Sequence, residues 1–303
     1  MTNLDSYVTQ TVTTDPGAFA DLVAALPSDL PSLQAASTQL VFHYRGGGDW
    51  AEHGIAPERI GEVDLRYADA LLGRLVELAD QPLDAPRASA QKLVGCCRDY
   101  TLLLVSMARQ HGIPARSRVG FAGYFFPGWW IDHVVAEIWD ADQNRWKLVE
   151  AQLPAGFVDA GTGQPLEVLD VPRDRFLVGP DAWQRARAGE LDPETFVVHP
   201  DLYEVPLRSW PYLRHNLVVD LAALGGRDMV LWDDWGILDS RFSTDDLPLL
   251  DELAATTVDP EAVDPEAVAE WLRHEAARIP ESVTSYSPAT GPGQVRLREG
   301  VPT

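Results

Sequence analysis

The fold of this chain is decided by residues 95–153. They begin with GCCRDYTLLLVSMARQHGIPARSRVGF (95–121) and continue through WWIDHVVAEIWD (129–140) to RWKLVEAQL (145–153). This stretch places a cysteine at the start of a helix, a histidine on a strand and an acidic residue on the following strand. Attack of sulfur on a carbonyl needs these three residue types, as nucleophile, as base and as the group that orients the base. The sequence therefore predicts thiol-dependent acyl transfer.

Secondary structure within this stretch follows from its apolar pattern. Residues 98–111 are apolar enough for a largely buried helix. Gly112 and Pro114 are expected to end it, because glycine suits the left-handed position after a helix and proline cannot continue one. Strands with alternating side chains are expected at 115–126, 132–140 and 145–153. We therefore predict an α+β fold in which the nucleophile helix packs on an antiparallel sheet.

The regions on either side are interpreted as additions to this core. Residues 32–43 and 57–79 have the apolar spacing of helices. Later segments are rich in Pro, Asp and Gly, and after residue 280 Ser, Pro, Gly and Thr dominate. The predicted regions are an N-terminal helical layer (1–84), a catalytic core (85–155), a C-terminal extension packed on the core (156–279) and a disordered tail (280–303).

Composition limits the class of protein. Of the 303 residues, 46% are hydrophobic, which is enough for a folded core. The net charge of −22 repels phosphate backbones and anionic lipids, so neither nucleic acid nor a membrane surface is expected as a partner. The two cysteines, Cys96 and Cys97, are adjacent rather than spaced for disulfides, and the first residues lack a signal-peptide pattern. These features predict a cytoplasmic protein with reduced thiols.

The candidate catalytic residues are Cys97, His133 and Glu150. Free N–H groups and the dipole at a helix N-terminus favour a thiolate, so a lowered pKa is expected for Cys97. His133 can take the thiol proton near neutral pH, and Glu150 on the next strand can fix the tautomer of the ring. Each residue alone has a plainer explanation, as a small buried thiol, a strand histidine and an exposed charge. Their combination favours the catalytic interpretation.

Other residues are candidates for binding. The aromatic residues before His133, which either wall an acyl-donor site or cover the core, are Tyr124, Phe125, Phe126, Trp129 and Trp130. Among them, Tyr124, Trp129 and Trp130 are the predicted substrate-binding residues. Gln91 is either an oxyanion-hole donor beside the backbone N–H of Cys97 or a solvated helix residue. No calcium-loop or zinc-ligand spacing is visible, so no metal or other cofactor is expected.

These motifs resemble the transglutaminase-like (papain-related) superfamily over roughly residues 85–155. The family shows Gly-x-Cys-Arg-Asp-aromatic at the nucleophile, Gly-Ile-Pro-Ala-Arg after the helix, and Trp-x-x-x-Asp at the acid. The matching residues are Gly95-Cys96-Cys97-Arg98-Asp99-Tyr100, Gly112-Ile113-Pro114-Ala115-Arg116, Val119-Gly120-Phe121, Asp132-His133 and Trp146-Lys147-Leu148-Val149-Glu150. Similarity to bacterial transglutaminase-like proteins extends to AWQRARAG, NLVVDLAAL and LWDDWG.

The resemblance implies a papain-like core and a role for each candidate. Cys97 is the nucleophile because it directly precedes Arg98, His133 is the base, and Glu150 stands where the family has Asp. The implied reaction is attack on an amide or thioester carbonyl of a small molecule or peptide, through an acyl-cysteine, with water or an amine as acceptor. Hydrolysis and aminolysis are both open from the sequence. A catalytically inactive binding or scaffold module is the alternative function.

Overall fold

The centre of the molecule is a five-stranded sheet in the computed structural model, which describes residues 4–204 and 206–299. Its strands lie in the order β5 (Arg145–Val149), β4 (Trp130–Asp140), β3 (Ala115–Ala122) and β6 (Phe176–Val178), all antiparallel, and β7 (Phe196–Val197) pairs in parallel with β4. Two smaller sheets are formed by β1 (Val41–His43) with β2 (Leu93–Gly95), and by β8 (Asp233–Asp234), β9 (Ser282–Ser287) and β10 (Gly291–Arg296). The predicted α+β fold is confirmed.

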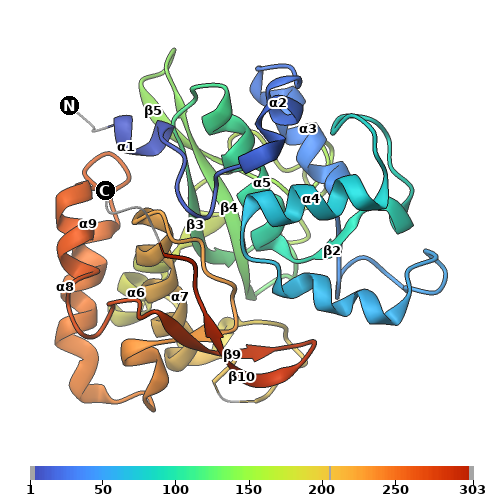
Figure 1. The fold of residues 1–303 in the computed structure, drawn as a ribbon. Coiled ribbons are helices and arrows are strands. Elements are labelled where there is room, and N and C mark those ends of the chain that lie inside the picture. Colours follow the sequence, from blue (N-terminus) through green and yellow to red (C-terminus); the bar gives the residue numbers. More distant parts are fainter. Residues whose placement is uncertain (1–3, 205, 300–303) are drawn as a thin grey trace.

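Helices from both ends of the sequence pack around this sheet (Figure 1). Helix α5 (Cys97–Gln110) is almost entirely buried and packs on β4, where the hydroxyl of Thr101 donates to the carbonyl of Val134 (2.9 Å). Figure 1 shows the N-terminal helices on one side of the sheet and the C-terminal helices on the other. The remaining helices are α1 (Asp5–Val8), α2 (Ala20–Ala24), α3 (Leu30–Leu40), α4 (Ala68–Leu78), α6 (Gly179–Arg187), α7 (Ser209–Leu224), α8 (Leu247–Thr257) and α9 (Pro265–Trp271), and the 3-10 segments include η2 (Pro57–Asp64) and η3 (Ser89–Gln91).

The predicted helix over 57–79 is interrupted. Residues 65–67 are extended between η2 and α4. The interruption lets the buried side chain of Arg66 pair with Asp233, and it leaves the carbonyl of Arg66 free to accept from the side chain of Arg98. These contacts come from the C-terminal extension and from α5, so the local apolar spacing could not reveal them.

The predicted helix over 32–43 ends early. Helix α3 stops at Leu40, and the next three residues form β1. This strand pairs in parallel with β2, so that His43 lies opposite Gly95. The N-terminal region is therefore not purely helical, and its strand reaches the segment that carries the candidate nucleophile.

The prediction of a disordered tail is wrong for residues 282–296, which form the hairpin of β9 and β10. Val283 is buried, and the hydroxyls of Ser285 and Ser287 bond to side chains of the N-terminal region, Arg66 (3.2 Å) and Asp64 (2.6 Å) respectively. A segment rich in Ser and Thr is ordered here because distant polar groups satisfy its hydroxyls. Residues 300–303 of the predicted tail lie outside the described residues.

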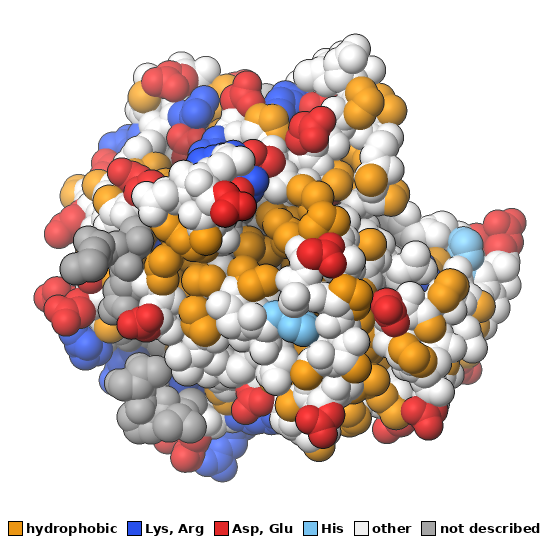
Figure 2. Space-filling model, turned by 90° about the horizontal axis from the view of Figure 1, so that it is seen from above, with side chains coloured by type: hydrophobic (Ala, Val, Ile, Leu, Met, Phe, Trp, Pro, Cys, Tyr) orange, Lys and Arg blue, Asp and Glu red, His pale blue; other side chains and the backbone are white. Residues whose placement is uncertain are grey.

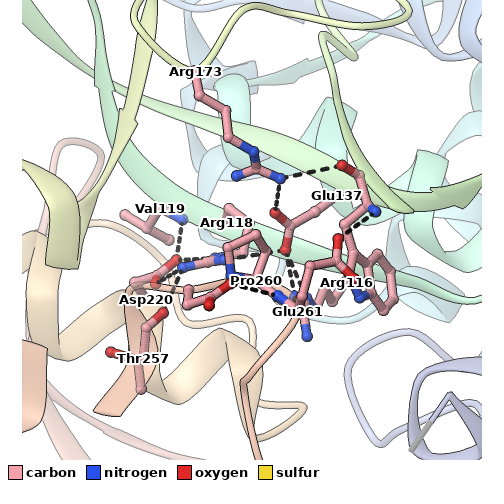
Figure 3. A network of polar contacts seen from close by, with 11 residues as sticks. Arg116, Arg118, Val119, Glu137, Arg173, Asp220, Thr257, Pro260 and Glu261 are labelled. Atoms are coloured by element: carbon pink, nitrogen blue, oxygen red, sulfur yellow. Dashed lines mark hydrogen bonds and ion pairs between the residues drawn. The ribbon is translucent and has the colours of Figure 1, made fainter. Parts of the chain in front are cut away.

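A buried ion network joins the sheet to the C-terminal extension (Figure 3). Glu137 on β4 accepts hydrogen bonds from Arg116 (2.7 Å), Arg118 (3.1 Å) and Arg173 (2.7 Å). Arg118 also donates to both carboxylate oxygens of Asp220 on α7 (3.0 and 2.8 Å). The side chains of Arg116, Arg118, Glu137 and Asp220 are at most 1% exposed. The extension is thus held to the core by paired charges as well as by apolar contacts.

The acidic residues do not form a cluster on the face of the molecule shown in Figure 2. Acidic side chains are scattered across that face, and hydrophobic side chains gather near its centre. Within residues 4–204 and 206–299, no helix combines the length and the apolarity needed to cross a membrane.

Gly120 is a position where packing requires glycine. It lies on β3 opposite His133, and a methyl group there would come within 2.1 Å of the carbonyl oxygen of Leu177 on β6. Gly120→Ala is therefore expected to lower the free energy of unfolding by about 1–3 kcal/mol, as overpacking does. Gly61→Ala is the matched control, because the methyl group would meet no atom within 4 Å. Urea unfolding of both variants checks this prediction, which equal midpoints would contradict.

Candidate active site

Cys97 occupies the first position of α5, immediately after β2. Asp99 holds this turn in place, because its carboxylate accepts the backbone N–H of Cys96 (2.9 Å) and pairs with Arg98 (3.0 Å). A methyl group at Gly95 would lie 2.6 Å from the same carboxylate, so glycine is required there. The Gly-Cys-Cys-Arg-Asp motif is therefore the local sequence that fixes the backbone around the candidate nucleophile.

His133 and Glu150 are in contact, with Nε2 and Oε2 separated by 2.8 Å. Glu150 also accepts the hydroxyl of Tyr124 and the backbone N–H of Gln152 (2.9 Å). Burial alone would raise the pKa of the Glu150 carboxyl, but His133, Tyr124 and Gln152 together hold that pKa below its usual value. An ionised carboxylate only accepts, so Nε2 of His133 carries the hydrogen and Nδ1 is left to take a proton. The longer side chain of Glu150 thus reaches the histidine.

The Cys97 thiol differs from the prediction. A hydrogen bond with the Cys96 side chain, burial and the charge of Asp132 all raise the pKa of Cys97, while the backbone N–H of Val134 lowers it. The net result is a pKa well above the usual value, so the expected lowering is wrong. The helix N-terminus does favour a thiolate, but it is opposed by a second thiol and a carboxylate beside it. Cys97 is therefore a neutral thiol that needs a base to react.

Cys97 and His133 line the same cavity, which has a volume of about 1130 Å³. Its walls come from the N-terminal region, from the aromatic loop before His133 and from the C-terminal extension. The apolar part of the lining includes Phe125, Phe126, Phe157, Leu207, Trp232 and Tyr286. Ligand sites are commonly about 300–1,000 Å³ and mainly apolar with a few polar groups; this cavity has a mainly apolar lining and is slightly larger than that range.

Residues 75–151 match the transglutaminase-like superfamily, and this range contains Cys97, His133 and Glu150. This part of the chain is a transglutaminase-like domain. No curated protein matches the chain. Among solved structures it is similar to a proposed cysteine protease from Cytophaga hutchinsonii, with 14% identity, coverage of 58% of this chain and 45% of the other, and a TM-score of 0.34. The chain thus spans less than half the length of that protein.

The aromatic loop of the transglutaminase-like domain contributes two rings to the cavity. Phe125 and Phe126 line it, and the ring of Phe125 meets the imidazole of His133 edge-on, with centroids 5.1 Å apart. Trp232 lines the cavity from the C-terminal extension, whereas Trp235 is fully buried. The choice between a substrate wall and a core cover, left open by the sequence for the aromatic loop, thus favours the cavity wall for Phe125 and Phe126.

Two of the three predicted substrate-binding residues, Tyr124 and Trp130, have other side-chain contacts. Tyr124 is fully buried and donates to Glu150, so it positions the acid rather than the substrate. Trp130 stacks on Phe196 of β7, with ring centroids 6.0 Å apart. In the part of the chain that the structure describes, Tyr124, Trp129 and Trp130 do not belong to the cavity lining. The geometry therefore does not support their assignment to substrate binding.

Other residues of the cavity lie outside the site predicted from the sequence. His43 lines the cavity, although it was placed at the end of a helix, and Tyr286 lines it from the segment that was predicted to be disordered. Gln91, the candidate oxyanion donor, accepts the backbone N–H of Ala88 (3.1 Å) and, among the described residues, is not part of the lining. The glycines at 46–48 were a sequence signal near His43, because a run of glycine marks the end of a helix or strand and the start of a loop.

Helix α7 fixes the end of β4 that carries His133. Asp132 accepts hydrogen bonds from the hydroxyl of Tyr212 (2.6 Å) and from the amide of Asn216 (2.9 Å). The same amide donates to the carbonyl of Gly120 on β3 (3.0 Å). The extension thus supports the transglutaminase-like domain directly beside its histidine.

Proposed function

We propose that this protein is a cysteine-dependent acyl-transfer enzyme that makes or breaks amide bonds of a small molecule or peptide. The observation that carries the proposal is the hydrogen bond of ionised Glu150 to His133, because His133 lines the same cavity as Cys97. A histidine oriented in this way has a free nitrogen for the thiol proton, which a thiol of raised pKa requires.

The reaction proceeds through an acyl-cysteine. Nδ1 of His133 takes the proton of Cys97 while the sulfur attacks the carbonyl carbon of an amide or thioester. The tetrahedral intermediate then loses the amine or thiol, which takes its proton from His133, and the acyl group remains on Cys97 as a thioester. Water or an amine attacks this thioester and restores the thiol. Glu150 stabilises the imidazolium that forms in both steps.

The cavity supports an acyl donor with an apolar acyl group. Its aromatic and aliphatic walls, which include Phe125, Phe157 and Leu207, offer apolar contacts to such a group. The size of the cavity exceeds what an acetyl group would fill, so longer acyl chains are expected to react better than short ones.

A p-nitrophenyl hexanoate assay tests the proposed chemistry. Wild-type protein is expected to release p-nitrophenolate in a burst and to gain the mass of one hexanoyl group on the peptide that contains Cys97. Cys97→Ala is expected to lose both signals. Cys96→Ala is the control, in which the adduct still forms on Cys97, and forms faster at neutral pH because the first cause of the raised thiol pKa is gone.

Glycinamide in the same assay, with Cys97→Ala as the blank, separates hydrolase from transferase. N-Hexanoylglycinamide formed in excess of the Cys97→Ala blank would show transfer to an amine, and hexanoic acid alone would show hydrolysis. A wild-type protein that forms no acyl adduct at Cys97 and releases p-nitrophenolate no faster than Cys97→Ala would refute the enzyme and leave the binding or scaffold module as its function.

A further inference from the structure

We propose that His43 is a further catalytic residue of this cavity. Its Nε2–H donates a hydrogen bond to the substrate carbonyl oxygen as that oxygen becomes negatively charged. The backbone N–H of Cys97 supplies the second donor. This role rests on the proposed acyl transfer, and it provides the stabilisation of charge that such a reaction needs at its tetrahedral intermediate.

The pairing of β1 with β2 brings His43 to the nucleophile. His43 lies opposite Gly95, two residues before Cys97, and the pairing continues with the N–H of Tyr44, which donates to the carbonyl of Gly95 (2.8 Å). Paired strands lie about 4.8 Å apart, so the backbone of His43 is close to the turn into α5. The side chain of His43 lines the same cavity as Cys97 and His133.

The loop after β1 sets the tautomer of His43. The backbone N–H groups of Arg45 and Gly46 lie 3.2 and 2.9 Å from Nδ1, which accepts from them. A ring nitrogen that accepts carries no hydrogen, so the hydrogen of the neutral imidazole is on Nε2. Nε2 is thus the polar atom that His43 can offer to a ligand, and it is a donor before any substrate arrives.

The charge state of His43 fits a donor rather than a base. Burial lowers the pKa of His43 to about 4, and the electrostatic interactions with His133 and Arg45 act in the same direction. The ring is therefore neutral near pH 7 and holds protons too weakly to replace His133 as the base. A neutral imidazole stabilises an oxyanion through its fixed N–H without taking or losing a proton.

The second donor follows from the position of Cys97. As the first residue of α5, its N–H has no carbonyl within the helix to bond. Among the described residues Gln91 is not part of the cavity lining, whereas His43 is, so the side-chain donor of the pair is assigned to His43. Two preset donors around one carbonyl oxygen form an oxyanion hole.

Two reagents separate this role from a structural one. p-Nitrophenyl acetate acetylates Cys97: the sulfur attacks the ester carbonyl, an oxyanion forms, and p-nitrophenolate leaves. Iodoacetamide alkylates the same sulfur by displacing iodide from a saturated carbon, and no oxyanion forms. Loss of an oxyanion donor should therefore slow acetylation and spare alkylation, and each rate is measured by intact mass and by peptide mapping.

The matched variants are His43→Gln and His43→Met. Their side chains are similar in length and volume, but only glutamine offers an N–H donor. His43→Met is expected to acetylate Cys97 about 100-fold more slowly than wild type, as removal of one oxyanion donor does, while its alkylation rate is unchanged. His43→Gln is expected to recover most of the acetylation rate. The thermal unfolding midpoint of each variant is measured as well, to show that both are folded at the temperature of the rate measurements.

Three results would overturn the proposal. Equal slowing of acetylation and alkylation in His43→Met would show that His43 only shapes the cavity or the thiol. Equal acetylation in the glutamine and methionine variants would show that no donor is needed. Absence of acetylation at Cys97 in the wild type would refute the proposed function itself, and this role with it.

Discussion

His133→Ala is expected to lower the rate of Cys97 acylation at pH 7 by about 10²–10⁴-fold, the usual contribution of a general base. The effect should be this large because the raised pKa of Cys97 leaves little thiolate without a base. Raising the pH should restore part of the rate in the variant, since hydroxide then removes the thiol proton. The burst of p-nitrophenolate, followed from pH 6 to 10, is the measurement.

The controls for this prediction separate the base from the fold. His111→Ala changes a histidine at the other end of α5 and should leave the rate unchanged. Glu150→Gln should reduce the rate less than His133→Ala does, because an amide still holds the ring but no longer stabilises the imidazolium. A rate in His133→Ala that equals wild type at pH 7 would contradict the assignment of the base.

The nucleophile end of the site was predictable because its determinants are neighbours in the sequence. The turn from Gly95 into α5 depends on Asp99, three residues after Cys96, and Gly112 ends the helix with the predicted left-handed backbone (φ 74°). Spacings of this kind are set by helix geometry, so a single sequence displays them.

The rest of the cavity depends on pairings between distant segments. His43 reaches the site only because two three-residue strands pair, and Tyr286 only because a Ser-rich hairpin finds partners in the N-terminal region. The predicted direction of the Cys97 pKa shift was also wrong: the hydrogen bond with the Cys96 side chain, burial and the charge of Asp132 raise the pKa, and burial and the Asp132 contact are both tertiary. The local sequence pattern predicts where the helix begins and therefore where its dipole favours a thiolate. It does not predict which distant residues pack against that helix end.

Glu137→Gln is expected to lower the free energy of unfolding by about 3–5 kcal/mol, which is typical when one partner of a buried ion pair is removed. The amide keeps the volume but leaves the buried guanidinium of Arg116 without a counter-charge and reduces the pairing of Arg118. Urea unfolding, with the slope checked against wild type, is the measurement. Arg187→Gln is the control: its pair with Asp251 is exposed, so a loss of no more than about 1 kcal/mol is expected.

The pH dependence of this loss follows from the charge on Glu137. Burial alone would raise the pKa of its carboxyl, but Arg116, Arg118 and Arg173 outweigh burial and hold that pKa well below its usual range. A depressed pKa means that the unfolded chain binds the proton first as the pH falls, so this stabilisation is complete above about pH 4.3 and declines below it. The difference between wild type and Glu137→Gln should therefore be constant from pH 6 to 8 and shrink in acid. A difference independent of pH down to 3 would show that packing, rather than charge, joins the sheet to the C-terminal extension.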